Sequence, residues 1–129
     1  MALGGHRVFA FIQLVTTGVA GDEFRKNTFA RDGRAILREL AKLLSLPKGS
    51  YNIRYNRAGI GSSGDVILHG EWLYVCFTAD TTAGLGFMYR SRAGQRDYAG
   101  GTNQWLPWDA LLNLPVTAQV MARCMSTNR

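Results

Sequence analysis

The sequence contains little cysteine and little histidine: two of each in 129 residues. Two cysteines, Cys76 and Cys124, are too few for a disulfide-based scaffold. Two Cys and two His at unrelated spacings do not form a zinc-binding pattern. We therefore expect no metal and no cofactor. Cys76 lies in an apolar run, where a buried free thiol is the ordinary arrangement, so cysteine usage favours a reducing cytoplasm.

Long hydrophobic runs are also missing, and none approaches the roughly 20 residues of a membrane-spanning helix. The apolar stretch 8–15 follows Arg7 and precedes Val19-Ala20-Gly21, an arrangement that a secretory signal also shows. The stretch is short, however, and Gln13 interrupts it. We expect no membrane span and a cytoplasmic protein.

Acidic residues are scarce, with nine Asp and Glu against 15 Lys and Arg, which gives a formal net charge of +6. Only three of the basic residues are lysines, so arginine carries most of the charge, and its planar fork of donors suits phosphates, carboxylates and base edges. This balance is compatible with nucleic acid, an anionic membrane surface or an acidic protein partner. The 47% hydrophobic content excludes a disordered chain, and the length fits a single domain over residues 1–129.

Hydrophobic spacing predicts a helix over residues 31–46, with Pro47 and Gly49 ending it. Asp32 is the expected N-cap, although Thr28 would allow an earlier start. The apolar stretch 8–17 is compatible with a buried helix or a buried strand, and we favour a helix. The apolar face of the 31–46 helix comprises Ile36, Leu37, Leu40, Leu43 and Leu44.

After Pro47 the pattern changes to short β-like runs separated by turn signals. We expect a tight hairpin at 69–71, a helical turn at 107–112 and a last helix over 116–125. The order of these elements predicts an α+β fold, in which N-terminal helices pack on a three- to four-stranded antiparallel meander and a short C-terminal helix follows. The expected core joins Leu37, Leu40 and Leu44 to Leu73, Val75 and Phe77. The predicted strands cover 51–55, 66–69, 72–77 and 86–90.

The 31–46 helix carries a basic stripe opposite its leucines, formed by Arg31, Arg34, Arg38 and Lys42. Arg34 and Arg38 at its centre are candidates for contacting a phosphate backbone or an acidic partner. A charged outer face is also the normal state of a surface helix, so the stripe alone does not indicate a site.

Segment 89–105 is the stronger candidate for a binding site, and we expect it to be a long loop. It combines arginines that contact phosphates, aromatic rings that stack on bases and an amide that makes directional hydrogen bonds. The same mixture forms protein–protein hot spots, and an ordered loop packed on the sheet edge is the structural alternative. The candidate residues are Tyr89, Arg90, Arg92, Arg96, Tyr98, Asn103 and Trp105.

Acid–base chemistry has a weaker signal in Asp65, His69 and Glu71, which flank the predicted hairpin. Asp65 and His69 lie four apart on a strand and so share a face. A His beside a carboxylate is the minimum for general acid–base catalysis, but no nucleophile accompanies the pair. A turn hydrogen bond accounts for His69 equally well, so we assign no catalytic residue.

The run 64–69 with Leu73-Tyr74-Val75, followed by Tyr89-Arg90 and by residues 96–101, is similar to small uncharacterised proteins of bacterial mobile genetic elements. The resemblance implies a plasmid- or phage-associated accessory protein and brings no activity with it. A coarser likeness links the chain to ribosome-dependent RNA-cleaving toxins, which are also small and basic with helices before an antiparallel sheet. Those toxins usually begin with a strand, and their late basic motif is missing here.

These features together predict a small, basic, non-catalytic accessory domain that binds a polyanion, with nucleic acid, either DNA or RNA, as the favoured partner. A protein-interaction module is the first alternative, for example an anti-defence inhibitor that recognises an acidic protein surface. An RNA-cleaving, toxin-like enzyme is the second. The sequence predicts no particular oligomeric state.

Overall fold

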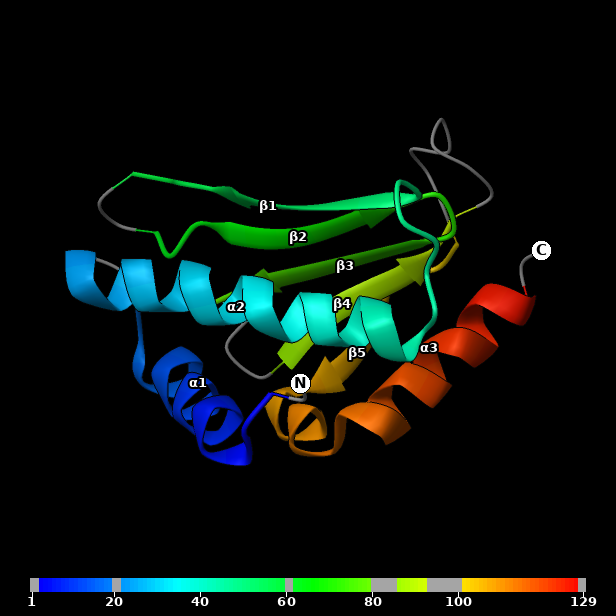
Figure 1. Ribbon diagram of the computed structural model, residues 1–129. Helices are drawn as coiled ribbons and strands as arrows, with labels where there is room; N and C mark the ends of the chain where they lie inside the picture. Colours follow the sequence, from blue (N-terminus) through cyan, green and yellow to red (C-terminus); the bar gives the residue numbers. More distant parts are fainter. Residues whose placement is uncertain (1–2, 20–21, 60–61, 80–85, 93–100, 128–129) are drawn as a thin grey trace.

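The computed structural model describes residues 3–19, 22–59, 62–79, 86–92 and 101–127. Its helices lie on one face of an antiparallel sheet, which confirms the predicted α+β class (Figure 1). The helices are α1 (Gly5–Thr17), α2 (Glu23–Leu43), the 3-10 helix η2 (Trp108–Asn113) and α3 (Leu114–Thr127). The strands are β1 (Tyr51–Asn56), β2 (Asp65–Gly70), β3 (Leu73–Thr78), β4 (Gly86–Ser91) and β5 (Gln104–Pro107).

The sheet is a meander in the order β1-β2-β3-β4-β5, with every neighbouring pair antiparallel. It has five strands, so the expectation of three to four was too low. The additional strand is β5, which lies in the segment predicted to be a loop. Its register places Leu106 opposite Phe87 on the core side of the sheet. This apolar cross-strand pair stabilises the addition of the short β5 strand to the sheet.

The two faces of the sheet differ because side chains alternate along each strand. In β3, Leu73, Val75 and Phe77 are buried, whereas Tyr74 and Cys76 between them are only half-buried. The buried set faces the helices, with α2 contacting β1 and β2 and α3 contacting β4 (Figure 1). No helix among the described residues covers the opposite face.

A cluster of aromatic rings joins the helices to the sheet. Phe11 of α1 stacks on Phe29 of α2 with ring centroids 5.7 Å apart. Phe77 of β3 lies 5.7 Å from Phe11 and 5.2 Å from Phe87 of β4. Trp108 at the start of η2 lies 5.6 Å from both Phe77 and Phe87. Offset and edge-to-face ring pairs of this kind stabilise a fold by more than the apolar area they bury. The cluster therefore connects five elements: α1, α2, β3, β4 and η2.

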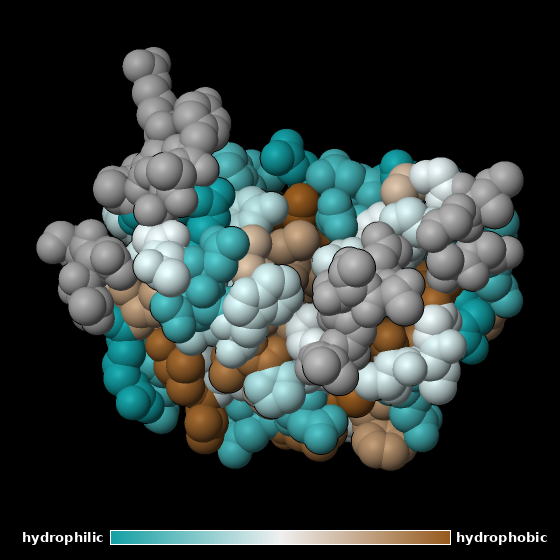
Figure 2. Space-filling model, turned by 180° about the vertical axis from the view of Figure 1, so that it is seen from behind, coloured by the Kyte–Doolittle hydropathy of each residue, from teal (hydrophilic) through white to brown (hydrophobic). Residues whose placement is uncertain are grey.

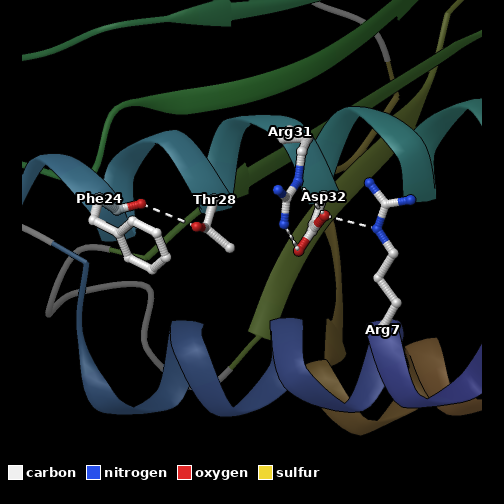
Figure 3. A network of polar contacts seen from close by, with 5 residues as sticks. All are labelled: Arg7, Phe24, Thr28, Arg31 and Asp32. Carbon is white, nitrogen blue, oxygen red and sulfur yellow. Dashed lines mark hydrogen bonds and ion pairs between the residues drawn. The ribbon is translucent and has the colours of Figure 1, made fainter.

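Helix α2 begins at Glu23, eight residues before the predicted start, so the assignment of Asp32 as its N-cap was wrong. Asp22 caps the helix instead, since its side chain accepts a hydrogen bond from the Arg25 backbone N–H at 3.1 Å. Asp32 lies within the helix and is buried. Its Oδ1 accepts from Nε of Arg7 in α1 at 2.8 Å and from Nε of Arg31 at 3.0 Å (Figure 3). A carboxylate paired in this way links α1 to α2.

The remaining expectations about local structure agree with the fold to different degrees. Stretch 8–17 is helical, within α1. The β2–β3 turn consists of Glu71 and Trp72, one residue later than predicted. Leu37 and Leu40 are fully buried with the three expected strand residues, while Leu44 is half-buried at the edge of the core. Within the described part of the chain, no helix is long and apolar enough to cross a membrane.

Candidate functional site

The side of the sheet opposite the helices, here called the open face, carries polar and aromatic side chains that no helix among the described residues covers. Viewed from this side, hydrophilic and intermediate residues surround smaller apolar patches (Figure 2). Alternation and strand register assign to the open face Asn52, Arg54, Asn56, Asp65, Ile67, His69, Tyr74, Cys76, Thr78, Met88, Arg90 and Trp105.

Four of these residues form a line across four strands, here called the polar row. Asn52 of β1 pairs with His69 of β2, His69 with Tyr74 of β3, and Tyr74 with Arg90 of β4. Directly opposed residues in an antiparallel sheet have neighbouring side chains. The register therefore places an amide, an imidazole, a phenol ring and a guanidinium side by side.

Contacts within the polar row hold its rings in a fixed arrangement. The His69 and Tyr74 rings meet edge to face, with centroids 6.1 Å apart and an interplanar angle of 89°. The Arg90 guanidinium carbon lies 4.9 Å from the centroid of the Tyr74 ring. At this distance a cation–π attraction favours the position of the Arg90 charge beside the Tyr74 ring. The polar row therefore places two aromatic rings and one cation on neighbouring strands.

A second line runs beside the polar row, two residues further along each strand. It begins at Arg54 in β1 and ends at Trp105 in β5, which is 59% exposed. The side chains between them are apolar or weakly polar: Ile67, Cys76 and Met88. Trp105 therefore adds an exposed indole to the open face, and Arg54 adds an exposed cation.

The electrostatic environment of His69 reflects the arginines around it. Desolvation is the largest effect that lowers its pKa below the usual value, and the positive charges of Arg92, Arg54 and Arg90 add to it. The imidazole is therefore neutral near pH 7 and lies in a field of positive charge. Such a field attracts anions to this part of the open face.

Asp65 and His69 share the open face, as predicted, but they do not form an acid–base pair. They stand at opposite ends of β2, about 13 Å apart along the strand at the usual rise per residue. Glu71 lies outside the strand, in the turn. The thiol of Cys76 is also unreactive near neutral pH, because burial raises its pKa to about 11.

Two residues predicted to contact a partner are instead part of the protein interior. Tyr89 is buried in β4 and faces the core. Arg92 is only 3% exposed, and its Nη1 donates a hydrogen bond to the Gly70 carbonyl oxygen at 3.0 Å. Tyr89 falls within the predicted strand 86–90, where alternation turns it toward the core, and β4 continues to Ser91, directly before Arg92. Arg96 and Tyr98 lie outside the described residues.

The other predicted site residues divide between two sides of the molecule. Arg90 and Trp105 belong to the open face, and Asn103 is exposed just before β5. Arg34, half-buried, and Arg38, exposed, belong to α2, which covers the opposite face of the sheet. The helix stripe and the described residues of the 89–105 segment therefore lie on different sides of the sheet.

Sequence reasoning missed Asn52, Arg54 and Tyr74 as members of a shared surface, and it considered His69 only as a partner of Asp65. A signal for the first two was present, since Tyr51, Ile53 and Tyr55 alternate with polar residues in β1. The missing information was the register. Only the pairing of β2 with β3 brings His69 and Tyr74 together.

Comparison of the chain with protein-family models, curated proteins and solved structures gives no significant match. The resemblance to proteins of mobile genetic elements therefore stays a prediction. Among the described residues, no group of three or more His, Cys, Asp or Glu side chains is placed to hold a metal ion. The function must be argued from the open face itself.

Proposed function

We propose that this domain binds single-stranded nucleic acid on the open face of its sheet, without catalysis. The observation that carries the proposal is the polar row, in which His69, Tyr74 and Arg90 lie side by side on neighbouring strands. Proteins that bind single strands combine aromatic side chains, on which bases stack, with cations that contact the backbone. The open face provides both in one place.

The dimensions of the open face support a single-stranded ligand. With strands about 4.8 Å apart, the polar row spans about 14 Å from β1 to β4. That length corresponds to about four stacked nucleotides at roughly 3.4 Å each. Aromatic rings on the surface of a sheet can contact base faces only where the bases are unpaired and splayed out. In a duplex the base faces are stacked inside, so only the phosphates would be accessible to the open face.

The distribution of charge favours a polyanion over a neutral partner. Arg90 ends the polar row in β4, and Arg54 lies two residues along β1 from Asn52 at the other end of the row. Among the described residues, Asp65 is the one carboxylate that the register assigns to the open face. Asp65 lies at the far end of β2 from His69. The separation of this acid from the imidazole also favours binding over cleavage.

Fluorescence anisotropy with labelled RNA and DNA oligonucleotides, single-stranded and duplex, tests the proposal. We expect Trp105→Ala to raise the Kd for single strands by about 5- to 150-fold, because a base–aromatic stack contributes about 1–3 kcal/mol. Phe24→Ala is the matched control, since Phe24 is also an exposed aromatic residue, at 79%, but lies on α2. Equal effects of the two variants would contradict the proposal.

A salt titration separates the proposal from recognition of an acidic protein. The logarithm of the affinity for single strands should fall linearly with the logarithm of salt concentration. Arg54→Ala should reduce that slope by about 0.7 if it removes one phosphate contact. Absence of measurable affinity for any RNA or DNA, together with one stoichiometric protein partner, would favour the protein-interaction alternative.

A further inference from the structure

A second basic surface lies on the helix side of the molecule, in a cleft between the start of α1, the second half of α2 and the segment before β1. The cleft has a volume of about 910 Å³. Five basic side chains and a single carboxylate, Glu39, line it. The basic residues are His6, Arg7, Arg38, Lys42 and Lys48.

The cations of the cleft differ in how far other groups already engage them. The Nε of Arg7 donates a hydrogen bond to Asp32 at 2.8 Å (Figure 3). Arg38 and Lys42 are exposed one turn apart on α2, and no hydrogen bond or ion pair within the described residues engages either side chain. Neutralising an anion here would therefore not require breaking an existing ion pair.

The start of α1 adds to the positive potential of the cleft. Its N-cap is Gly4, which provides no side-chain hydrogen bond, and its first turn contains no acidic residue. Gly4 itself lines the cleft. The partial positive charge of a helix N-terminus therefore acts in the same direction as the five basic side chains.

The cleft connects with the open face around the edge of the sheet. β1 is an edge strand, and a smaller cavity of about 170 Å³ lies at its first residues, lined in part by Asn52 and His69 of the polar row. Tyr51 lines both this cavity and the basic cleft. A chain that leaves the polar row at β1 thus reaches the cleft by passing Tyr51.

We infer that the cleft between α1 and α2 binds the phosphodiester backbone of the same strand whose bases lie on the open face. The inference rests on the proposed function and extends its site beyond the sheet. The open face accommodates about four stacked nucleotides, so only a longer strand can reach Arg38 and Lys42. The cleft therefore determines the length of the bound segment and most of its salt dependence, while the polar row contacts bases.

The test compares two single-stranded RNA oligonucleotides, of about 5 and about 15 nucleotides, within the range of known site sizes. For the double variant Arg38→Ala with Lys42→Ala we expect the Kd of the longer strand to rise about 10-fold, and its salt slope to fall by about 1.4 for two lost phosphate contacts. The shorter strand should bind as to the wild type. Arg57→Ala with Arg123→Ala removes the same charge from exposed positions outside the cleft and should leave both affinities nearly unchanged.

The outcomes distinguish this inference from the proposed function. If the double variant binds the longer strand like the wild type while Trp105→Ala weakens both strands, the cleft inference is wrong and the open face remains the site. If the double variant loses affinity for both strands equally and Trp105→Ala loses affinity for neither, the cleft is a separate anion site and both proposals are overturned. An acidic peptide of equal charge should not displace the longer strand. If it does displace that strand, and if Trp105→Ala does not change the affinity, the inference is overturned in favour of a protein partner.

Discussion

Arg92 and Gly70 are joined by a buried hydrogen bond of 3.0 Å from the arginine Nη1 to the glycine carbonyl oxygen, across 22 residues of sequence. Gly70 ends β2, and Arg92 directly follows β4. The bond therefore links two strands that are separated in the sheet by β3. This relationship gives Arg92 a structural role at the end of the meander.

The first prediction concerns this bond. Arg92→Ala should lower the free energy of unfolding by about 1–3 kcal/mol, because it removes a hydrogen bond to a charged group and leaves a buried carbonyl oxygen without that donor. Urea unfolding followed by circular dichroism measures the change. Arg38→Ala, an exposed arginine on α2, should change the free energy by less than about 0.5 kcal/mol. An unchanged midpoint for Arg92→Ala would mean that the bond contributes nothing.

The second prediction compares two leucines on α2. Leu40 is fully buried against the sheet, whereas Leu43, almost one turn later, is 40% exposed. Leu40→Ala should cost about 2–5 kcal/mol through lost transfer energy and the cavity left behind. Leu43→Ala should cost about 1 kcal/mol or less, since less apolar area is withdrawn from water. Similar unfolding midpoints for the two variants would contradict the orientation of α2 on the sheet.

The third prediction concerns pH. The pKa of His69 is lowered in the folded protein, first by desolvation and then by Arg92, Arg54 and Arg90. Between the lowered pKa and about 6.5 the unfolded chain binds more protons at this residue than the folded protein does. The stability contributed by His69 is therefore fully present above pH 6.5 and is lost as the pH falls toward its folded pKa.

His69→Gln should remove this part of the pH dependence. Unfolding free energies measured from pH 7.5 down to pH 5 should fall less steeply for the variant than for the wild type. A histidine NMR titration provides a direct check, because the pKa of the His69 imidazole should lie below the usual value for histidine. A His69 midpoint above 6.5 would contradict a pKa lowered by desolvation and by the surrounding arginines.

Local patterns in the sequence determined the class of fold. Leu37 and Leu40 recur at helical spacing, and Tyr51, Ile53 and Tyr55 alternate with polar residues. These periodicities involve residues only a few positions apart, so they can be read before any tertiary contact is known. They also indicated which faces of the helix and the strands would be buried.

Contacts between distant residues decided what local patterns could not. The early start of α2 accompanies the stacking of Phe29 on Phe11 of another helix. Strand β5 exists because Leu106 pairs with Phe87, 19 positions away. The burial of Arg92 likewise depends on Gly70. None of these partners lies within the span over which periodicity or capping acts.

The candidate site shows the same division. The sequence by itself determined that arginines and aromatic residues are abundant and that several of them fall in segment 89–105. Strand register decided which of them meet: it aligned His69, Tyr74 and Arg90 across three strands and turned Tyr89 into the core. A shift of the register by one residue would exchange the two faces of a strand. The proposed binding surface is therefore a property of the paired strands, which long-range hydrogen bonds and core packing select.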